Sequence, residues 1–296
     1  MNKSISFKRK CLPYFLIAPA MVGIILFVVY PMVNLIYNSF FKVNQINPDK
    51  TKYVKFENYA NMFESSAFQK ALINTAIYTV FSVALILAVA LALSVWLAGK
   101  KSKFNSFVQG CAFLPHVISM VSIGLIFQQM MDPDFGIFNA LLRCLHLPEG
   151  TWLRSSDTVV GSIILTNIWK SAGYYTLILA AAIKSIPESI YEAAALDRAG
   201  KMKTFFRITL PMISPQIFFS VIVLTIGSFK IFDMIYIMSG GGPNNASTSL
   251  VYYIYTNVFQ NFDVGRASAA GVILMAMVGL MTVVYFWGLS KKVHYQ

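Results

Sequence analysis

Polar side chains that could bind a polar ligand stand at helical spacing inside an apolar stretch, residues 158–183. Asn167, Lys170 or Ser171, and Tyr174 follow one another at intervals of three or four residues, which place them on one face of a helix. Asn offers a donor and an acceptor together, and Tyr joins an apolar ring to a hydrogen-bonding tip. This face is therefore suited to a ligand rich in hydroxyl groups.

A second polar group, Ser228, Lys230 and Asp233, stands inside the apolar stretch 212–238. Lys230 and Asp233 are three residues apart and could neutralise each other on one helix. Direct contact with a ligand and a pair between Asp233 and Lys170 remain open as alternatives. Lys170 could also extend to the outer membrane interface. Two lysines at such positions raise the further alternative of an anionic ligand.

Known catalytic patterns are absent from the sequence. There is no GxxxxGK[ST], HExxH or GxSxG motif, and the histidines His116, His146 and His294 are far apart. The three cysteines, Cys11, Cys111 and Cys144, form no CxxC pair. We therefore predict no catalytic residue, no metal site and no cofactor in this chain, which is not itself an enzyme.

The composition predicts the elements that must position these residues. Of 296 residues, 57% are hydrophobic and only 12% are charged, with a mean hydropathy of +0.62, whereas soluble domains carry about 25% charged residues. A bilayer core requires about 20 apolar residues of helix. Because lipid offers backbone groups no partner, we predict an all-α membrane protein with six transmembrane helices. They lie within 12–40, 71–98, 106–130, 158–183, 212–238 and 265–289.

The first stretch is too long for the apolar part of a cleaved signal peptide and is predicted to be an uncleaved helix. Pro31 and Pro115 are predicted to kink their helices. The expected organisation is a cytoplasmic segment 1–11, a first helix with its outer loop 12–70, a five-helix core 71–289 and a cytoplasmic end 290–296.

The basic residues predict the orientation. With the N-terminus inside, more than half of the 24 lysines and arginines fall in cytoplasmic segments, as the positive-inside rule requires. Both termini and residues 191–211 then face the cytoplasm. Orientation accounts for the net charge of +12, so the basic pI gives no reason to expect nucleic acid as a partner.

The cytoplasmic segment 191–211 reads YEAAALDRAGKMKTFFRITLP. Its alanines and lysines favour helix, Ile186-Pro187 marks the start, and Leu210-Pro211 is predicted to end it. Physical chemistry alone predicts a short helix or helix pair at the membrane surface, and an amphipathic helix resting among lipid headgroups is an equally simple interpretation.

This segment resembles the EAA loop of permease subunits of binding-protein-dependent ABC importers. Nine positions fall in register with the family pattern: Glu192, Ala193, Ala194, Asp197, Ala199, Phe205, Ile208, Leu210 and Pro211. The Gly that usually follows the Asp is Arg198 here, with Gly200 two positions later, so the bend is expected to shift.

Three further blocks are similar to the sugar and glycerol-phosphate subfamily of these permeases. LPYFLIAPAMVGIILFVVYP resembles its first span, and FLPHVISMVSIGLIFQQMMDPDFGIFNALL resembles its third span and the following loop. SGGGPNNASTSLVYYIYTNVFQNFDVGRASA resembles its last outer loop. The four blocks cover nearly the whole chain in order.

The resemblance implies roles for the residues. The segment 185–211 would be a coupling helix that enters a cleft of a separate ATPase, through Glu192, Ala193, Ala194, Asp197, Ala199, Gly200, Phe205, Leu210 and Pro211. The fourth and fifth spans would line the substrate pathway with Asn167, Lys170, Ser171, Tyr174, Ser228, Lys230 and Asp233. The last outer loop, with Gly241, Gly242, Pro243 and Asn244, would lie at the docking surface for a binding protein or at the gate.

The resemblance further implies the partners: a second homologous permease subunit, two ATPase subunits that carry ATP and Mg²⁺, an extracytoplasmic binding protein and membrane lipid. The expected function is ATP-driven import of an oligosaccharide or related polyol across the cytoplasmic membrane of a prokaryote. A secondary carrier driven by an ion gradient is the alternative, disfavoured because Asp233 is the one acid inside the predicted spans and no inverted repeat is evident. An anionic substrate, such as a glycerol-phosphate or acidic sugar, remains open.

Overall fold

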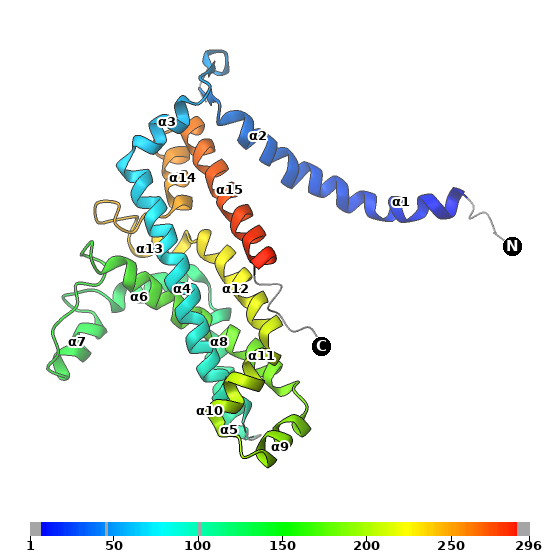
Figure 1. Cartoon of the computed structure of the whole chain (residues 1–296). Coiled ribbons are helices and arrows are strands. Elements are labelled where there is room, and N and C mark those ends of the chain that lie inside the picture. The colour runs from blue at the N-terminus through cyan, green and yellow to red at the C-terminus, as the bar shows by residue number, and fades with distance from the viewer. Residues whose placement is uncertain (1–6, 45–46, 100–101, 289–296) are drawn as a thin grey trace. The chain divides into compact units, whose positions relative to one another are not determined.

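A computed structural model describes residues 7–44, 47–99 and 102–288 of the chain (Figure 1). The described residues are mainly helical, with one small antiparallel hairpin that pairs β1 (Phe41–Lys42) with β2 (Lys52–Tyr53). They form two compact units. The first contains the described residues up to Glu64 together with Ile254–Ile273, and the second contains the described residues of Ser65–Tyr253 together with those from Leu274 onward.

The first unit begins with a long apolar helix. It consists of α1 (Phe7–Ile24), a π-helical turn η1 (Ile25–Val29) and α2 (Tyr30–Asn38). Residues Leu12–Asn38 are long and apolar enough to cross a membrane, which confirms the predicted first helix. Phe27 is 81% exposed, as expected of a side chain that would face lipid rather than a protein core.

Polar contacts then tie the predicted outer loop of the first unit together. The loop holds the β1–β2 hairpin, a 3-10 turn η2 (Pro48–Lys50) and α3 (Glu57–Glu64). The Asn58 side-chain amide donates to the carbonyls of Ser39 (2.8 Å) and Phe41 (3.0 Å), and the Tyr59 hydroxyl donates to Ser39 Oγ (2.8 Å). The loop is therefore an ordered element that begins where α2 ends.

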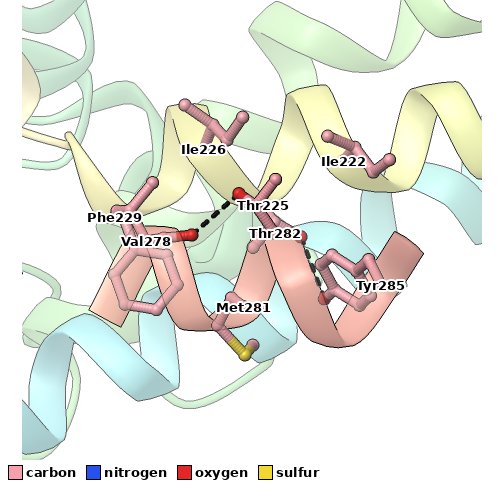
Figure 2. A pocket seen from close by; sticks show the side chains of 8 residues that line it. All are labelled: Ile222, Thr225, Ile226, Phe229, Val278, Met281, Thr282 and Tyr285. Atoms are coloured by element: carbon pink, nitrogen blue, oxygen red, sulfur yellow. Dashed lines mark hydrogen bonds between the residues drawn. The ribbon is translucent and has the colours of Figure 1, made fainter. Parts of the chain in front are cut away.

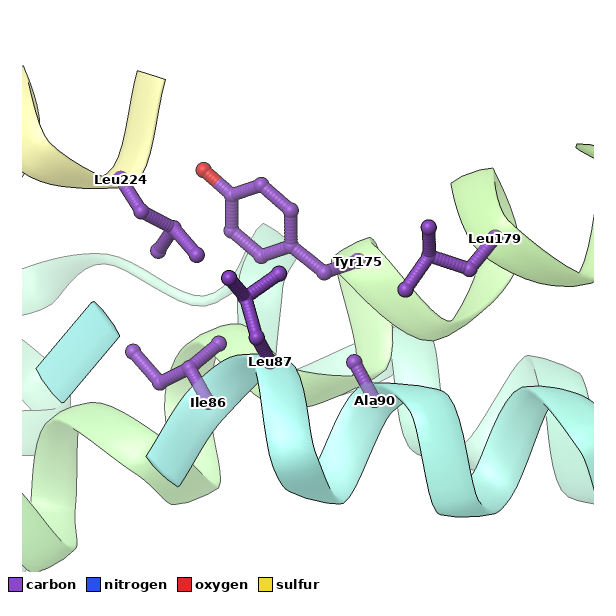
Figure 3. Close-up of a cluster of buried hydrophobic side chains, with 6 residues drawn as sticks. All are labelled: Ile86, Leu87, Ala90, Tyr175, Leu179 and Leu224. Carbon is purple, nitrogen blue, oxygen red and sulfur yellow. The ribbon is translucent and has the colours of Figure 1, made fainter. Parts of the chain in front are cut away.

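In the second unit the core lies where α4 (Ser66–Ala98), α8 (Val159–Lys184) and α12 (Ser214–Phe229) meet. Figure 3 shows six of its buried side chains: Ile86, Leu87, Ala90, Tyr175, Leu179 and Leu224. On another side of α8, a Cβ on Gly173 would collide with the backbone oxygen of Ala112. Gly173 is therefore required for the close approach of α8 to α5 (Lys103–Val117).

The last helix, α15 (Val264–Gly288), also contributes to the second unit with its final residues. Figure 2 shows Val278, Met281 and Tyr285 of α15 against α12, where the hydroxyls of Thr225 and Tyr285 lie 3.1 Å apart. The depression lined by these side chains leaves no room for a water molecule. This contact is therefore packing and not a ligand site.

Two predicted helices are broken in the structure. The third consists of α5 and α6 (Met120–Met130), which meet at 97° at Ile118–Ser119, just after Pro115. The fifth ends at Phe229, and α13 (Asp233–Met238) follows after a break. At its other end α12 meets the preceding helical segment, Lys201–Met212, at 68°.

Within the described residues, fewer than the six predicted transmembrane helices are long and apolar enough to span a membrane. Three helices qualify as spans, Leu12–Asn38, Ser66–Ala98 and Val264–Gly288, and five qualify if each bent pair is one span. The predicted fourth helix exists as the 26-residue α8, which is not among the helices that qualify. The remaining helices are α7 (Ile137–Cys144), the short helical segments between Glu188 and Met212, and α14 (Leu250–Phe259). The predicted C-terminal segment 290–296 lies outside the described residues.

Candidate functional site

Lys170 lies at the break between α5 and α6. Its side chain is buried, and Nζ donates to the backbone oxygens of Ile118 (2.9 Å), His116 (3.2 Å) and Pro115 (3.4 Å). The carbonyls at the end of a helix have no partner within it, and a positive charge is favoured there. Lys170 therefore supplies the broken helix with hydrogen bonds that its own backbone cannot make.

The ionic alternatives predicted for these lysines are not found. No ion pair within the described residues includes Lys170, Lys230 or Asp233. Lys230 follows the last residue of α12 and Asp233 is the first residue of α13, so a break separates them and both are exposed. The predicted pair assumed one continuous helix and is wrong. Lys170 reaches buried carbonyls instead of the outer interface or Asp233.

The other predicted residues of α8 do lie together, facing α4. The Asn167 amide donates to Ser82 Oγ (3.3 Å), and Asn167 Oδ1 accepts from Ser171 Oγ (3.2 Å). The ring of Tyr174 stacks on His116 at 4.4 Å. Asn167, Ser171 and Tyr174 are all half-buried. They form a polar face with hydroxyl and amide groups, as their spacing predicts.

Two members of this polar face are not predicted by the sequence. Ser82 stands within an apolar run, and the wide spacing of the histidines gives no predicted role to His116. A small hydroxyl in an apolar helix is the available signal for Ser82, but the facing helix that makes it relevant is not visible in sequence. Ser228, the predicted member on α12, is buried.

The loop 239–249, which is predicted to lie on the outer side, is held by hydrogen bonds from the adjacent end of α4. The Asn74 amide donates to the carbonyls of Ala246 (2.8 Å) and Thr248 (3.1 Å), and the Tyr78 hydroxyl donates to that of Ser247 (3.1 Å). Lys70 Nζ adds a hydrogen bond to Asn244 O (2.8 Å). These residues of α4 are not predicted by the sequence as part of the site. Hydrogen bonds from α4 therefore fix the backbone of loop 239–249.

Within this loop the four predicted residues differ in environment. Gly241 is buried with φ +78°, and a Cβ there would stand 2.5 Å from the Tyr252 ring, so glycine is required. Gly242 and Pro243 are half-buried and line a cavity of about 530 Å³, while Asn244 is exposed. The predicted loop therefore combines a constrained base with an accessible tip.

The same cavity is bordered by a charged cluster that joins the loop after α6 to the segment between α7 and α8. Arg154 forms ion pairs with Asp134 (2.7 Å) and Asp132 (3.3 Å). Partial burial alone would raise the pKa of Asp132, but backbone N–H groups of Asp134 and Phe135 and the Arg154 charge lower it. The Asp134 hydrogen bond chiefly raises the pKa of Arg154. Both shifts favour the charged forms of Asp132 and Arg154.

The segment that resembles the EAA loop is a helical hairpin, which confirms the predicted helix pair. It contains α9 (Glu188–Leu196), α10 (Lys201–Thr204), a π-helical turn η3 (Phe205–Thr209) and α11 (Leu210–Met212). The sequence predicts that Leu210-Pro211 ends the helix, but the helical segment Lys201–Met212 continues past Pro211, directly after the π-helical turn in which the Leu210 N–H donates to Phe205 O. The helical segment ends at Ile213 instead.

The bend after α9 lies at Arg198 itself. Arg198 has φ +51°, its N–H donates to Ala195 O (3.0 Å), and the Ala199 N–H donates to Ala194 O (2.9 Å). These bonds form the left-handed cap that usually contains Gly. Gly200 has φ −67°, so the expectation that the bend shifts toward it is wrong. The turn keeps its place although the residue is not glycine.

The hairpin, residues 188–212, has one side that packs against the rest of the chain and an opposite side that exposes apolar side chains. Ala194 is buried, and the Tyr191 and Thr209 hydroxyls lie 3.2 Å apart, joining α9 to η3. Ala199 and Phe205 line a cavity of about 960 Å³ that also touches the ends of α4 and α8. In contrast, Leu196, Met202 and Phe206 are 85%, 69% and 56% exposed.

The remaining predicted residues of the hairpin are distributed around it. Glu192, Ala193, Asp197 and Gly200 are exposed, whereas Leu210 and Pro211 are half-buried. Exposed carboxylates on α9 therefore stand near the exposed Leu196 side chain. Large exposed apolar side chains flanked by charges are typical of a protein-binding surface.

Comparison with known proteins gives a consistent result. Residues 9–290 match the family described as "Binding-protein-dependent transport system inner membrane component". The chain is 34% identical, over 93% of its length and 89% of the relative's, to the sulfoquinovosyl glycerol transport system permease protein SmoG of Agrobacterium fabrum. It is 31% identical, over 99% of both chains, to the sn-glycerol-3-phosphate transport system permease protein UgpA of Brucella suis.

A solved structure has the same fold. The chain resembles one from a bacterial alginate ABC transporter in complex with an alginate pentasaccharide-bound periplasmic protein, with a TM-score of 0.84 and 25% identity. The match covers 97% of this chain and 98% of the other. The chain therefore belongs to the family of binding-protein-dependent transport system inner membrane components, the permease subunits of ABC importers.

Proposed function

We propose that this chain is the translocation subunit of an ATP-driven importer in the cytoplasmic membrane of a prokaryote, with both termini in the cytoplasm. It pairs with a second homologous permease, and two separate ATPase subunits hydrolyse ATP. An extracytoplasmic binding protein delivers the substrate. The family membership supports this assembly, and the alginate transporter that the chain resembles was solved in complex with a periplasmic protein.

The observation that carries this proposal is the two-sided hairpin 188–212. Its inner side is fixed by buried Ala194 and the Tyr191–Thr209 contact, while Leu196 projects with 85% of its surface exposed. An exposed leucine on a charged cytoplasmic loop has no stabilising role within this chain. It gains most by insertion into an apolar cleft of an ATPase subunit, with Glu192 and Asp197 available to basic residues of that subunit.

The hairpin is suited to transmit motion because it is rigid. The Tyr191–Thr209 contact joins α9 to η3, and Ile186 and Ile213 pack together with Ala182 of α8. A displacement of α9 is thus passed to α8 and α12. Closure of two ATPase subunits would move the hairpin as one body and rock these helices between inward-open and outward-open states.

The polar face of α8 is the proposed substrate pathway. Asn167 and Ser171 provide amide and hydroxyl groups, Tyr174 provides a ring, and Ser228 of α12 is the further candidate. A sugar or polyol fits these groups because its hydroxyls need donors and acceptors together. Relatives named for sulfoquinovosyl glycerol, sn-glycerol-3-phosphate and arabinooligosaccharides support this class. Loop 239–249, with Asn244 at its tip, would receive the binding protein or form the gate.

An anionic substrate is the second candidate, and Lys230 is the observation that favours it. Lys230 is exposed at the break between α12 and α13 and has no ion pair with a described residue. Lys170 gives less support, since its ammonium group is engaged by three carbonyls. Lys230→Gln should reduce uptake of an anionic substrate selectively; equal loss with a neutral sugar would count against this candidate.

The coupling proposal is tested by Leu196→Glu. Burial of a leucine side chain contributes about 1.5–3 kcal/mol, so the variant should bind the ATPase subunit at least about tenfold more weakly. Binding-protein-stimulated ATP hydrolysis should fall with it. Leu147→Glu is the control, because Leu147 is 51% exposed on the predicted outer side. Unchanged ATPase binding in the Leu196 variant would refute the role of the hairpin.

A further inference from the structure

A polar cavity of about 350 Å³ opens where the end of α4, the start of α5 and the end of α8 meet. It is lined by Leu97 of α4, Gly99 directly after α4, Lys103 and Ser106 of α5, and Lys184 of α8. We name it the basic cavity. In the proposed orientation, on which this inference rests, it lies at the cytoplasmic surface of the membrane.

The charge of the basic cavity is positive and uncompensated. The charged residues of its lining are Lys103 and Lys184, and no Asp or Glu lines it among the described residues. Neither lysine forms an ion pair with any described residue. Ser102, Asn105 and Gln109 add hydroxyl and amide groups to the wall. Two lysines that line one cavity beside neutral donors are suited to bind a phosphate.

The surroundings of the basic cavity are apolar, which distinguishes a lipid from a free anion. On α5, Phe104 and Phe107 are 62% and 69% exposed, and they alternate along the chain with Lys103 and Ser106. Trp96, 53% exposed, precedes Leu97 on α4. Aromatic side chains of this kind are enriched at the membrane–water interface. A phosphate ion in water would gain nothing from these exposed rings.

We infer that the basic cavity binds the phosphate headgroup of an anionic phospholipid, whose acyl chains extend along the exposed rings of Phe104 and Phe107. Basic pockets between transmembrane helices on the cytoplasmic side are known to hold such headgroups. The volume equals roughly ten times the ~30 Å³ that a water molecule occupies in the liquid, which leaves room for a phosphoglycerol group. Lys184 and Lys103 would then connect α8 and α5 through a lipid.

The test is native mass spectrometry of the purified full-length chain after titration with phosphatidylglycerol or phosphatidylcholine. The wild type should bind phosphatidylglycerol in preference to phosphatidylcholine. Lys103→Gln with Lys184→Gln should reduce the phosphatidylglycerol affinity about thirtyfold, since each lysine near a membrane surface contributes roughly fivefold. The matched control is Lys203→Gln, which removes an exposed lysine of the hairpin that does not line the cavity.

Competition with inorganic phosphate distinguishes the two sources of the anion. Retention of phosphatidylglycerol in the presence of millimolar phosphate supports a lipid site. Displacement by phosphate, equal binding of both lipids, or equal loss in the Lys203 variant would overturn the inference. Because lipid binding is measured without ATP or partner subunits, its failure leaves the transport proposal intact, and failed transport leaves the lipid result intact.

Discussion

Substitution of Lys170 by Met separates a structural role of this lysine from a role in substrate charge recognition. Met has a similar length and apolar character but cannot donate to the carbonyls of Ile118, His116 and Pro115 at 2.9, 3.2 and 3.4 Å. The chain offers a matched control in Lys230→Met, because Lys230 is exposed and is also at a helix end.

The magnitude follows from the two shorter hydrogen bonds. A hydrogen bond to a charged group contributes about 1.5–3 kcal/mol, so loss of both would destabilise the fold by about 3–6 kcal/mol. Part of this destabilisation is offset, because the buried Lys170 ammonium has no carboxylate partner among the described residues and its burial costs hydration free energy that Met does not lose. We expect a net loss of about 2–3 kcal/mol for Lys170→Met. For Lys230→Met we expect less than about 0.5 kcal/mol, as for other exposed positions.

The assay is thermal unfolding in detergent or nanodiscs, followed by uptake of one neutral and one anionic substrate. The scaling for domains of 150–250 residues converts the expected loss to a decrease of roughly 5–10 °C in Tm. Uptake of both substrates should fall together, since the broken helix is misplaced for either. An unchanged Tm with loss of the anionic substrate alone would refute this reasoning and assign the charge to substrate recognition.

Three further predictions concern the turn at Arg198, the close approach of α8 to α5, and Asp132 in the loop that follows α6. Arg198→Gly should stabilise the hairpin by about 1 kcal/mol, because Gly adopts the left-handed φ without strain, and the gain should appear as slower amide hydrogen exchange. Gly200→Ala should be nearly neutral. Stabilisation by Gly200→Ala with no effect of Arg198→Gly would contradict the assigned bend. Gly173→Ala should prevent stable folding, measured by monodisperse yield, whereas Gly161→Ala on the same helix has open space and should be tolerated; equal yields would refute the close crossing. The pKa of Asp132 is lower in the folded protein, so this carboxylate stabilises the fold fully above about pH 4 and stops doing so as the pH falls through its folded pKa. Asp132→Asn should therefore remove the acid sensitivity of the loop in limited proteolysis. An unaltered pH profile would exclude the ion pairs of Asp132 as the cause of that sensitivity.

The positions of most helices could be predicted from sequence because each depends on local composition. The apolar lengths of Leu12–Asn38 and Ser66–Ala98 are sufficient to identify them as spans. The spacing of Asn167, Ser171 and Tyr174 is a property of one helix, and it predicted their common face. The helical hairpin likewise follows from its alanines and lysines.

What could not be predicted depends on contacts between distant segments or on single backbone angles. The carbonyls that engage Lys170 become available only because α5 ends at Val117, more than fifty residues earlier in the chain. The break before Asp233 separates two residues that a continuous helix would have paired. The left-handed Arg198 keeps a turn where the residue type favours a shift, because two backbone hydrogen bonds hold it.

The central claim, that this chain transports substrate with energy from separate ATPase subunits, is tested most directly by uptake into proteoliposomes. The chain would be reconstituted with its second permease, its ATPase subunits and its binding protein, with ATP inside the vesicles and labelled sugar or polyol outside. We predict uptake that requires both ATP and the binding protein and that falls in the Leu196→Glu variant. Uptake by this chain alone, driven by a proton or sodium gradient without ATP, would contradict the account.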